Sequence, residues 1–519
     1  MMRMLLILLA FFVLLGESRV GRAETGYGMR AWEAWLGQLN QSGYRVSQGG
    51  VKLFDNATCA ELITVFGSCF ANNPAAPYFV PEPPVDGTYV DPVYGTPFTT
   101  PGATGAPSNM FYRLANTDAL VTLVALPSQA AYMGYQSYVF TRAADRYPAT
   151  VSSRSTLPPT PSPDTHRYEI FGSIGNDINN VIIANRLGSV WNNGVAAYVT
   201  TSNMRLAKAL VTSAKAYGLD ERRIFIEPVG KNILTGTGRE ADDLIALIRY
   251  ALPKNELESR DWQRNIDKNI GVFRVSAAPG TAVERFPTPL YTKKQTSSEE
   301  AYAPSLDELS SLLSQWLTSQ AGRPATTDTM KRSLLVGPKG KLLGFVGREC
   351  IAKAYNCLGD NQDTDSYRFG SIGTLSENGL AIMTGINHTR LDNASYISIG
   401  VSNKEDQAGV GSASQTDPAT VGFESGTLTG SAEGVLKSLG LYERASPRLK
   451  ADLPYLYTVM IERNCTVAPD YCVAWADLKA LPLTASVMIF QRAYLKPGTT
   501  TGANPDVMPS PKLIYTSDQ

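Results

Sequence analysis

Two segments far apart in the chain share one pattern of strand-like runs, and this pattern constrains the fold more than any other feature. In the second half, Leu380–Ile386 and Tyr396–Val401 are joined by the polar connection Asn387–Asn393. In the first half, Ala119–Leu126 and Tyr132–Arg142 repeat the arrangement across a shorter connection. Short runs rich in β-branched and aromatic residues indicate strands. We therefore predict an α/β or α+β protein with two related lobes, each with a mixed sheet built on a strand hairpin.

The first lobe is also predicted to contain a βαβ unit. Val195–Thr200 and Arg223–Val229 are strand-like, and Met204–Tyr217 between them carries an apolar stripe at helical spacing. A helix between two strands favours parallel pairing with a right-handed crossover. The apolar run Ala241–Leu252, which ends before Pro253, is predicted to be a further helix.

A chain of 519 residues is too long for one hydrophobic core. A short helix is expected at Ala31–Leu39, and Ser305–Glu308 has the pattern of a capping box that opens an amphipathic helix over Leu306–Thr318. We divide the chain into a signal peptide (1–23), an N-terminal helical and Pro/Gly-rich region (24–110), a first α/β lobe (111–255), a linker plus amphipathic helix (256–330) and a second lobe (331–519).

The N-terminus has the order of charges and apolar residues found in secretory signal peptides. Arg3 precedes the apolar run Met4–Leu15, and small residues follow at Gly21–Ala23. The run is shorter than the roughly 20 residues that a spanning helix needs, although an N-terminal membrane anchor is the alternative. We expect a secreted or extracytoplasmic protein with no membrane span after signal removal.

The cysteines form three close pairs, which supports this compartment. In an oxidising compartment, neighbouring pairs predict local disulfides. Metal binding is the rival interpretation, but no pair has Cys-x-x-Cys spacing and both histidines lie far away in sequence. The predicted disulfide pairs are Cys59 with Cys69, Cys350 with Cys357 and Cys465 with Cys472.

Charge and sequons add two expectations about partners and processing. The 47 basic and 47 acidic side chains cancel, and no run of Lys and Arg stands out, which argues against a nucleic-acid partner. Sequons of the Asn-x-Ser/Thr type make the chain a candidate glycoprotein, although their number is near the chance expectation. The acceptor residues are Asn40, Asn56, Asn387, Asn393 and Asn464.

Two polar turns are candidates for binding or catalysis. Gly175–Asn180 carries Asp177 among amides and is able to hold an oxyanion, a hydroxyl group or a cation, or to cap its own turn. Gly359–Asp365 alternates acids and amides, so Asp360, Asp363 and Asp365 offer oxygen ligands for calcium. The EF-hand spacing is not met, and a solvated loop is the alternative. Calcium is the one cofactor for which the sequence offers a site.

His388 is the third candidate. Asp392 follows four residues later, and a carboxylate near an imidazole is able to orient it for general-base catalysis. The nucleophile would come from elsewhere, with Ser173 and Ser371 as candidates. The alternative is a histidine hydrogen-bonded within a loop.

No known catalytic motif is present, so two classes of function stay open. There is no Gly-x-Ser-x-Gly elbow, P-loop or His-Glu-x-x-His motif. We favour an extracellular hydrolase with a cleft between the lobes, using His388, Asp392 and Asp177. The alternative is a non-catalytic surface or matrix glycoprotein that binds carbohydrate or a protein partner.

Overall fold

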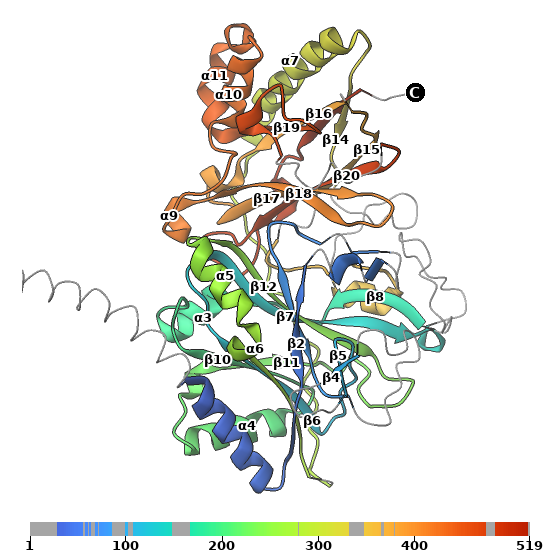
Figure 1. Ribbon diagram of the computed structural model, residues 1–519, viewed down its shortest axis with the longest axis vertical. Helices are drawn as coiled ribbons and strands as arrows, with labels where there is room; N and C mark the ends of the chain where they lie inside the picture. Colours follow the sequence, from blue (N-terminus) through green and yellow to red (C-terminus); the bar gives the residue numbers. More distant parts are fainter. Residues whose placement is uncertain are drawn as a thin grey trace, which may run out of the picture.

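The computed structural model describes residues 28–516, apart from 56–57, 61, 64–67, 71, 86–98, 102–106, 148–166, 279, 332–346, 365–367, 378 and 474–482. The predicted signal peptide, Asn56, His166 and Asp365 therefore lie outside the described residues. Figure 1 shows two lobes stacked along the long axis, with the sheets of both lobes toward the middle of the molecule.

The first lobe is built on two sheets. The outer sheet has the strand order β1-β13-β6-β10-β11, and the inner sheet, which faces the second lobe, has the order β2-β3-β12-β7-β8 with β9 beside β7 (Figure 1). The strands are β1 (Arg45–Gln48), β2 (Gly50–Phe54), β3 (Tyr78–Glu82), β6 (Asp118–Ala125), β7 (Ala130–Ala143), β8 (Arg167–Ser173), β9 (Ile178–Asn179), β10 (Val195–Thr201), β11 (Ile224–Pro228), β12 (Asp243–Pro253) and β13 (Ile270–Ser276).

The second lobe also has two sheets. Its outer sheet has the order β14-β21-β16-β19, and its inner sheet has the order β15-β20-β17-β18. The strands are β14 (Thr326–Thr329), β15 (Arg368–Thr374), β16 (Leu380–Ile386), β17 (Tyr396–Asn403), β18 (Gly409–Thr416), β19 (Leu456–Glu462), β20 (Ser486–Tyr494) and β21 (Lys512–Tyr515).

Helices cover the outer sheets because their apolar stripes need a partner surface. Residues 28–41, which contain the helix expected at Ala31–Leu39, and α4 (Met204–Ala216) pack on the first lobe. On the second lobe the same place is taken by α7 (Ala303–Ala321), α10 (Ser431–Ser438) and α11 (Pro447–Asp452) (Figure 1).

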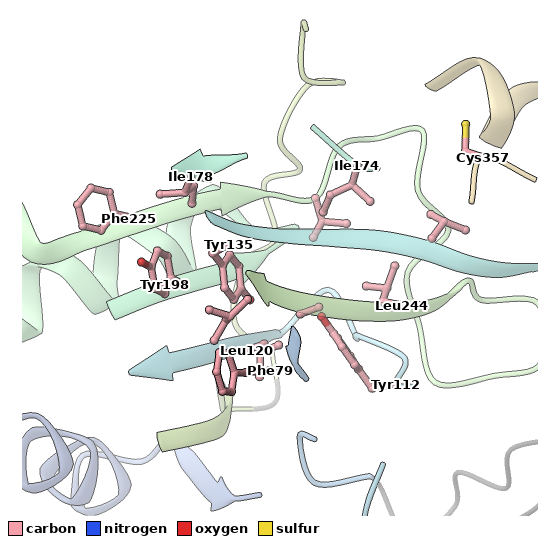
Figure 2. Close-up of a cluster of buried hydrophobic side chains, with 14 of the residues drawn as sticks. Phe79, Tyr112, Leu120, Tyr135, Ile174, Ile178, Tyr198, Phe225, Leu244 and Cys357 are labelled. Carbon is pink, nitrogen blue, oxygen red and sulfur yellow. The ribbon is translucent and has the colours of Figure 1, made fainter. Parts of the chain in front are cut away.

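The core of the first lobe lies between its two sheets. Tyr135 of β7 stacks on Tyr198 of β10 with ring centroids 4.5 Å apart. Figure 2 shows this pair among the apolar side chains of both sheets, with Cys357 at the edge of the same cluster. Because Met488 and Phe490 of β20, a strand of the second lobe, belong to the same cluster, the lobes are packed together through a common core.

The two lobes repeat one topology. Taken in chain order, β1, β3, β6, β7, β8, β10, β12 and β13 correspond to β14, β15, β16, β17, β18, β19, β20 and β21, and corresponding strands have the same neighbours. Every corresponding pair of neighbours is antiparallel. A helix packed on the outer sheet precedes each repeat, at residues 28–41 and at α7. The prediction of two related lobes is therefore confirmed at the level of topology.

The predicted hairpins are wrong, although the strands are present. β6 lies in the outer sheet and β7 in the inner sheet, and β16 and β17 are separated in the same way. All these strands bury side chains on both faces, so the apolar pattern does not show which neighbours a strand pairs with. The connections cross between sheets, as at the corner of a sandwich.

The type of strand pairing was predicted correctly in the first lobe and wrongly in the second. β10 and β11 are parallel and flank α4, which confirms the βαβ unit and the mixed sheet of the first lobe. The sheets described in the second lobe are antiparallel rather than mixed.

The run predicted as a helix at Ala241–Leu252 forms strand β12, because a continuous apolar run fits a buried strand as well as a buried helix.

The lobes also extend across the expected boundaries. Strands β1 to β3 and β13, from regions 24–110 and 256–330, complete the sheets of the first lobe. From region 256–330, α7 and β14 belong to the second lobe. From region 331–519, α8 (Gly347–Lys353) packs against β8 of the first lobe. Strand pairing over long sequence distances decides which lobe each segment belongs to, and amino-acid composition does not predict such pairing.

The capping box is also corrected. Helix α7 begins two residues before Ser305, with Pro304 in its first turn. Ser305 Oγ donates to Asp452 at 2.5 Å, and Glu308 accepts from the backbone N–H and hydroxyl of Ser446 at 2.8 and 2.7 Å. These residues therefore hold α11 against α7 instead of closing their own helix.

All three predicted disulfides are present, as Cys59–Cys69, Cys350–Cys357 and Cys465–Cys472. We expect the double variant Cys465→Ser/Cys472→Ser to lower the free energy of unfolding by about 2 kcal/mol, because a closed loop restricts the unfolded chain. Denaturant titration of the oxidised protein measures this change. An unchanged midpoint and slope would contradict the expectation.

Within the described residues, no helix combines the length and the hydropathy that crossing a membrane requires.

Candidate functional site

His388 lies inside the second lobe, at the start of the short helix η5 (His388–Leu391), and is 1% exposed. Its Nδ1 is 2.9 Å from each carboxylate oxygen of Glu299, and its Nε2 is 3.0 Å from Nε2 of Gln491. An amide nitrogen only donates, so the imidazole Nε2 accepts and Nδ1 carries the proton that Glu299 accepts. Both ring nitrogens are therefore engaged within the fold.

The partners of His388 are themselves hydrogen-bonded. Asn393 donates through Nδ2 to Glu299 Oε1 at 2.9 Å, and Tyr457 donates its hydroxyl proton to Gln491 Oε1. Glu299 is fully buried. The network joins η5 to β19, to β20 and to the segment before α7, which is the arrangement of a structural support.

The predicted pairing of His388 with Asp392 is wrong. Asp392 is exposed and adopts a left-handed backbone conformation with φ 54°, which ends η5, and its carbonyl accepts from Lys496 Nζ at 2.6 Å. The imidazole has Glu299 instead, a residue 89 positions away. Sequence spacing does not reveal such a partner.

Neither serine proposed as a nucleophile contacts His388. Ser173 is the last residue of β8 in the first lobe, and its Oγ donates to Asp360 at 2.7 Å. Ser371 lies in β15, and its hydroxyl group contacts the carbonyl group of Val487 at 3.3 Å. Neither Ser173 nor Ser371 is therefore placed to be activated as a nucleophile by His388.

Two of the sequons have buried acceptors. Asn393 Nδ2 donates to Ser297 and Glu299, and Asn387 is fully buried. A glycan at Asn393 would replace both of these hydrogen bonds. Asn40 and Asn464 are exposed.

The other two candidate turns do meet, between the lobes. Asp177, Asp360 and Asp363 are each at most 1% exposed. Asp177 Oδ2 accepts from the backbone N–H of Gln362 at 3.2 Å, so the Gly175–Asn180 turn touches the acidic loop directly. We call these three carboxyl groups the interlobe acid cluster.

Hydrogen-bond donors of both halves surround the interlobe acid cluster. Asp360 accepts from the backbone N–H and hydroxyl of Ser173 at 2.6 and 2.7 Å. Asp363 accepts from Tyr132 Oη at 2.8 Å and from Asn179 Nδ2 at 2.9 Å. Asn179 also caps helix α3 (Asn180–Leu187) through its Oδ1, so one side chain orders the helix and the cluster.

Calcium binding at this loop stays a prediction, because Asp365, the third predicted ligand, lies outside the described residues. Each oxygen of Asp360 and Asp363 faces an N–H or O–H donor instead of converging on a common point. Among the described residues, no group of three or more His, Cys, Asp or Glu side chains has the arrangement of a metal site.

Burial dominates the electrostatics of the cluster. Burial raises the pKa of Asp363 to about 7, against the hydrogen bonds from Tyr132 and Asn179 and the charges of Lys294 and Arg249. Burial also raises the pKa of Asp177 well above its usual range, and the neighbouring charge of Asp363 adds to the effect.

A cavity adjoins the cluster on the inner sheet of the first lobe. It encloses about 50 Å³. Most of its walls are apolar, and its charged lining residues within the described chain are Arg249 of β12 and Arg492 of β20. Both arginines are 3% exposed, and they come from different lobes. The apolar lining includes Phe54, Leu62, Phe70, Met110, Phe111, Phe140, Phe171, Ile245, Leu247 and Leu358.

Sequence reasoning missed this cavity, although a signal was present. Arg249 stands alone in the apolar run LIALIRYAL, and Arg492 stands in SVMIFQRAY. A charged residue in a strand buried on both faces needs a compensating partner or a function.

Comparisons with known proteins do not supply an identity. No protein-family model and no curated protein matches this chain. A solved structure described as a putative uncharacterized protein from Burkholderia cenocepacia aligns over 86% of this chain and 78% of its own, with 8% identity and a TM-score of 0.33.

Proposed function

We propose that this is a secreted, non-catalytic binding protein that holds a small apolar ligand in the cavity described above, on the inner sheet of the first lobe. The observation that carries the proposal is the cavity itself, since a concave apolar site with a few polar groups at its wall is the usual form of a ligand pocket. The signal-like N-terminus and the three disulfides support an extracytoplasmic location.

The state of the candidate catalytic groups favours binding over hydrolysis. A general base needs a ring nitrogen within reach of the substrate proton, and both nitrogens of His388 are bonded to buried side chains. Asp360 and Asp363 are equally enclosed. A hydrolase would have to break these networks before any substrate could reach them.

A cavity-filling variant tests the proposal. Leu247→Trp places an indole in the cavity, whereas Leu257→Trp adds the same group at a position that is 75% exposed. The ligands are hexanoate and hexanamide, two small molecules with one apolar tail. Ligand present at 100 times its Kd should stabilise the wild type by about 2.7 kcal/mol. We expect Leu257→Trp to keep this stabilisation and Leu247→Trp to lose it.

Thermal unfolding with and without ligand measures the effect. Equal stabilisation of both variants would show that binding occurs elsewhere. If neither compound stabilises the wild type at millimolar concentration, the proposed function is wrong.

A further inference from the structure

We infer that the second lobe carries a separate binding site for a neutral oligosaccharide, in a groove between helix α7 and strand β14. The site is distinct from the cavity of the first lobe and does not depend on it. The groove has a volume of about 500 Å³, which is a usual size for a small-molecule site. Within the described chain its lining residues are all polar, and six of them are serines or threonines.

One wall of the groove is a polar stripe along α7. The stripe recurs at three- and four-residue steps, so its members share one side of the helix. At about 1.5 Å per residue it is roughly 16 Å long. The neighbouring apolar stripe, with Leu309, Leu313 and Leu317, is buried in the lobe and holds the helix in place. The polar stripe consists of Asp307, Ser310, Ser311, Ser314, Gln315 and Thr318.

Hydroxyl side chains are an unusual choice for this stripe. Serine and threonine form helices less well than Lys, Glu, Gln or Arg, which commonly fill the exposed positions of a helix. The corresponding helix of the first lobe, residues 28–41, contains no serine or threonine. The repeated fold therefore does not require hydroxyl groups at this place, whereas a polar binding site does.

The other wall is strand β14, which forms an edge of the outer sheet and is exposed along its length. Thr327 and Thr329 both line the groove, because side chains two residues apart lie on one side of a strand. The N–H of Met330 donates to the carbonyl of Pro511 at 2.9 Å. Because an antiparallel ladder alternates, the backbone groups of Thr327 and Thr329 point away from β21. This wall therefore offers backbone as well as hydroxyl groups.

The charges of the groove balance one another. Lys512 Nζ lies 3.2 Å from Asp307 Oδ1 and donates to Thr329 Oγ1 at 3.1 Å, which joins the two walls. Lys512 and Asp307 are the charged lining residues that the structure describes. A ligand with a net charge would meet no excess of the opposite charge here, so the lining favours a neutral ligand.

A neutral ligand with many hydroxyl groups matches this lining. Each serine or threonine hydroxyl both donates and accepts, as a sugar hydroxyl does, while Asp307 adds acceptors and Lys512 adds donors. An apolar ligand would remove these groups from water without replacing their hydrogen bonds. The length of the stripe favours a linear oligosaccharide over a single sugar.

Titration calorimetry of the full-length protein with three trisaccharides tests the inference. Cellotriose and maltotriose are neutral, whereas trigalacturonate carries a carboxylate on each sugar. We expect the wild type to bind at least one neutral probe at millimolar concentration. It should bind that probe at least about 10-fold more tightly than trigalacturonate, because the balanced lining does not compensate the carboxylates.

Tryptophan variants locate the site. Ser314→Trp and Thr327→Trp fill the groove from opposite walls, and each should weaken binding of the neutral probe by at least about 10-fold. Gln320→Trp adds the same group at an exposed position of α7 outside the groove and should leave the affinity unchanged. If one of the groove variants does not fold, the other decides.

Binding of neither neutral probe by the wild type would overturn the inference, as would tighter binding of trigalacturonate. Neutral-probe binding that persists in the folded groove variants would also overturn it. The proposed function is tested separately by hexanoate and hexanamide, which probe the cavity of the first lobe, so the two can fail independently.

Discussion

Replacement of His388 by alanine is expected to lower the free energy of unfolding by about 3–5 kcal/mol. The variant leaves the Glu299 carboxylate buried with one donor fewer and removes the acceptor of Gln491. Removing one partner from a buried charged network costs this much because the remaining groups can no longer be hydrated. Denaturant titration at neutral pH measures the loss.

Arg390→Ala is the matched control for this experiment. It lies two residues away in the same helix η5, is exposed, and should change the free energy of unfolding by less than about 0.5 kcal/mol. The hydrolase hypothesis predicts a different pattern. A His388→Ala protein that is as stable as the wild type but loses activity toward an ester substrate would make His388 a catalytic residue and contradict our assignment.

The free energy of unfolding is expected to fall as the pH rises, because Asp363 loses a proton in the folded protein. Asp363 has a pKa of about 7 in the folded protein and about 3.9 when unfolded, so between these values the folded state binds the extra proton. Its contribution to stability is complete below pH 3.9 and is lost as the pH rises through 7. From pH 5 to pH 8 this group should lower the free energy of unfolding by about 3 kcal/mol.

The groups that face Asp363 are Tyr132, Asn179, Lys294, Arg249 and Asp177. Of these, Asp177 shifts in the same direction and strengthens the trend. Denaturant titrations at pH 5 and pH 8 measure the difference, and Asp363→Asn should make it smaller by removing the titrating group. A wild type that is more stable at pH 8, or an Asp363→Asn variant with the same difference, would contradict the expectation.

The interlobe acid cluster also makes the contact between the two lobes sensitive to pH. Asp177 lies at the end of the first lobe's inner sheet. The carboxylate of Asp363 accepts from Tyr132 of β7, and its backbone carbonyl accepts from the N–H of Leu495, which follows β20. Deprotonation of Asp363 therefore places an unfavourable charge where the lobes meet. The pH effect should accordingly be concentrated in contacts between the lobes.

Local features of the chain were predictable because they depend on near neighbours. The three disulfides close short loops, so the nearest cysteine is the available partner. The crossover β10-α4-β11 follows from a helix between two apolar strands. The contact between the Gly175–Asn180 turn and the acidic loop was only a possibility in the sequence, where both turns could be recognised as polar but not as neighbours.

Tertiary structure alone decided the pairing of strands and the partners of the charged groups. The sequence by itself determined that Leu380–Ile386 and Tyr396–Val401 are strands and that His388 lies between them. It did not determine that these strands enter different sheets, because side chains buried on both faces are compatible with either neighbour. Glu299 and Gln491 contact His388 across sequence separations of 89 and 103 residues. A buried polar group is satisfied by whichever donor or acceptor the fold brings near, and that is a property of the packed chain, not of local sequence.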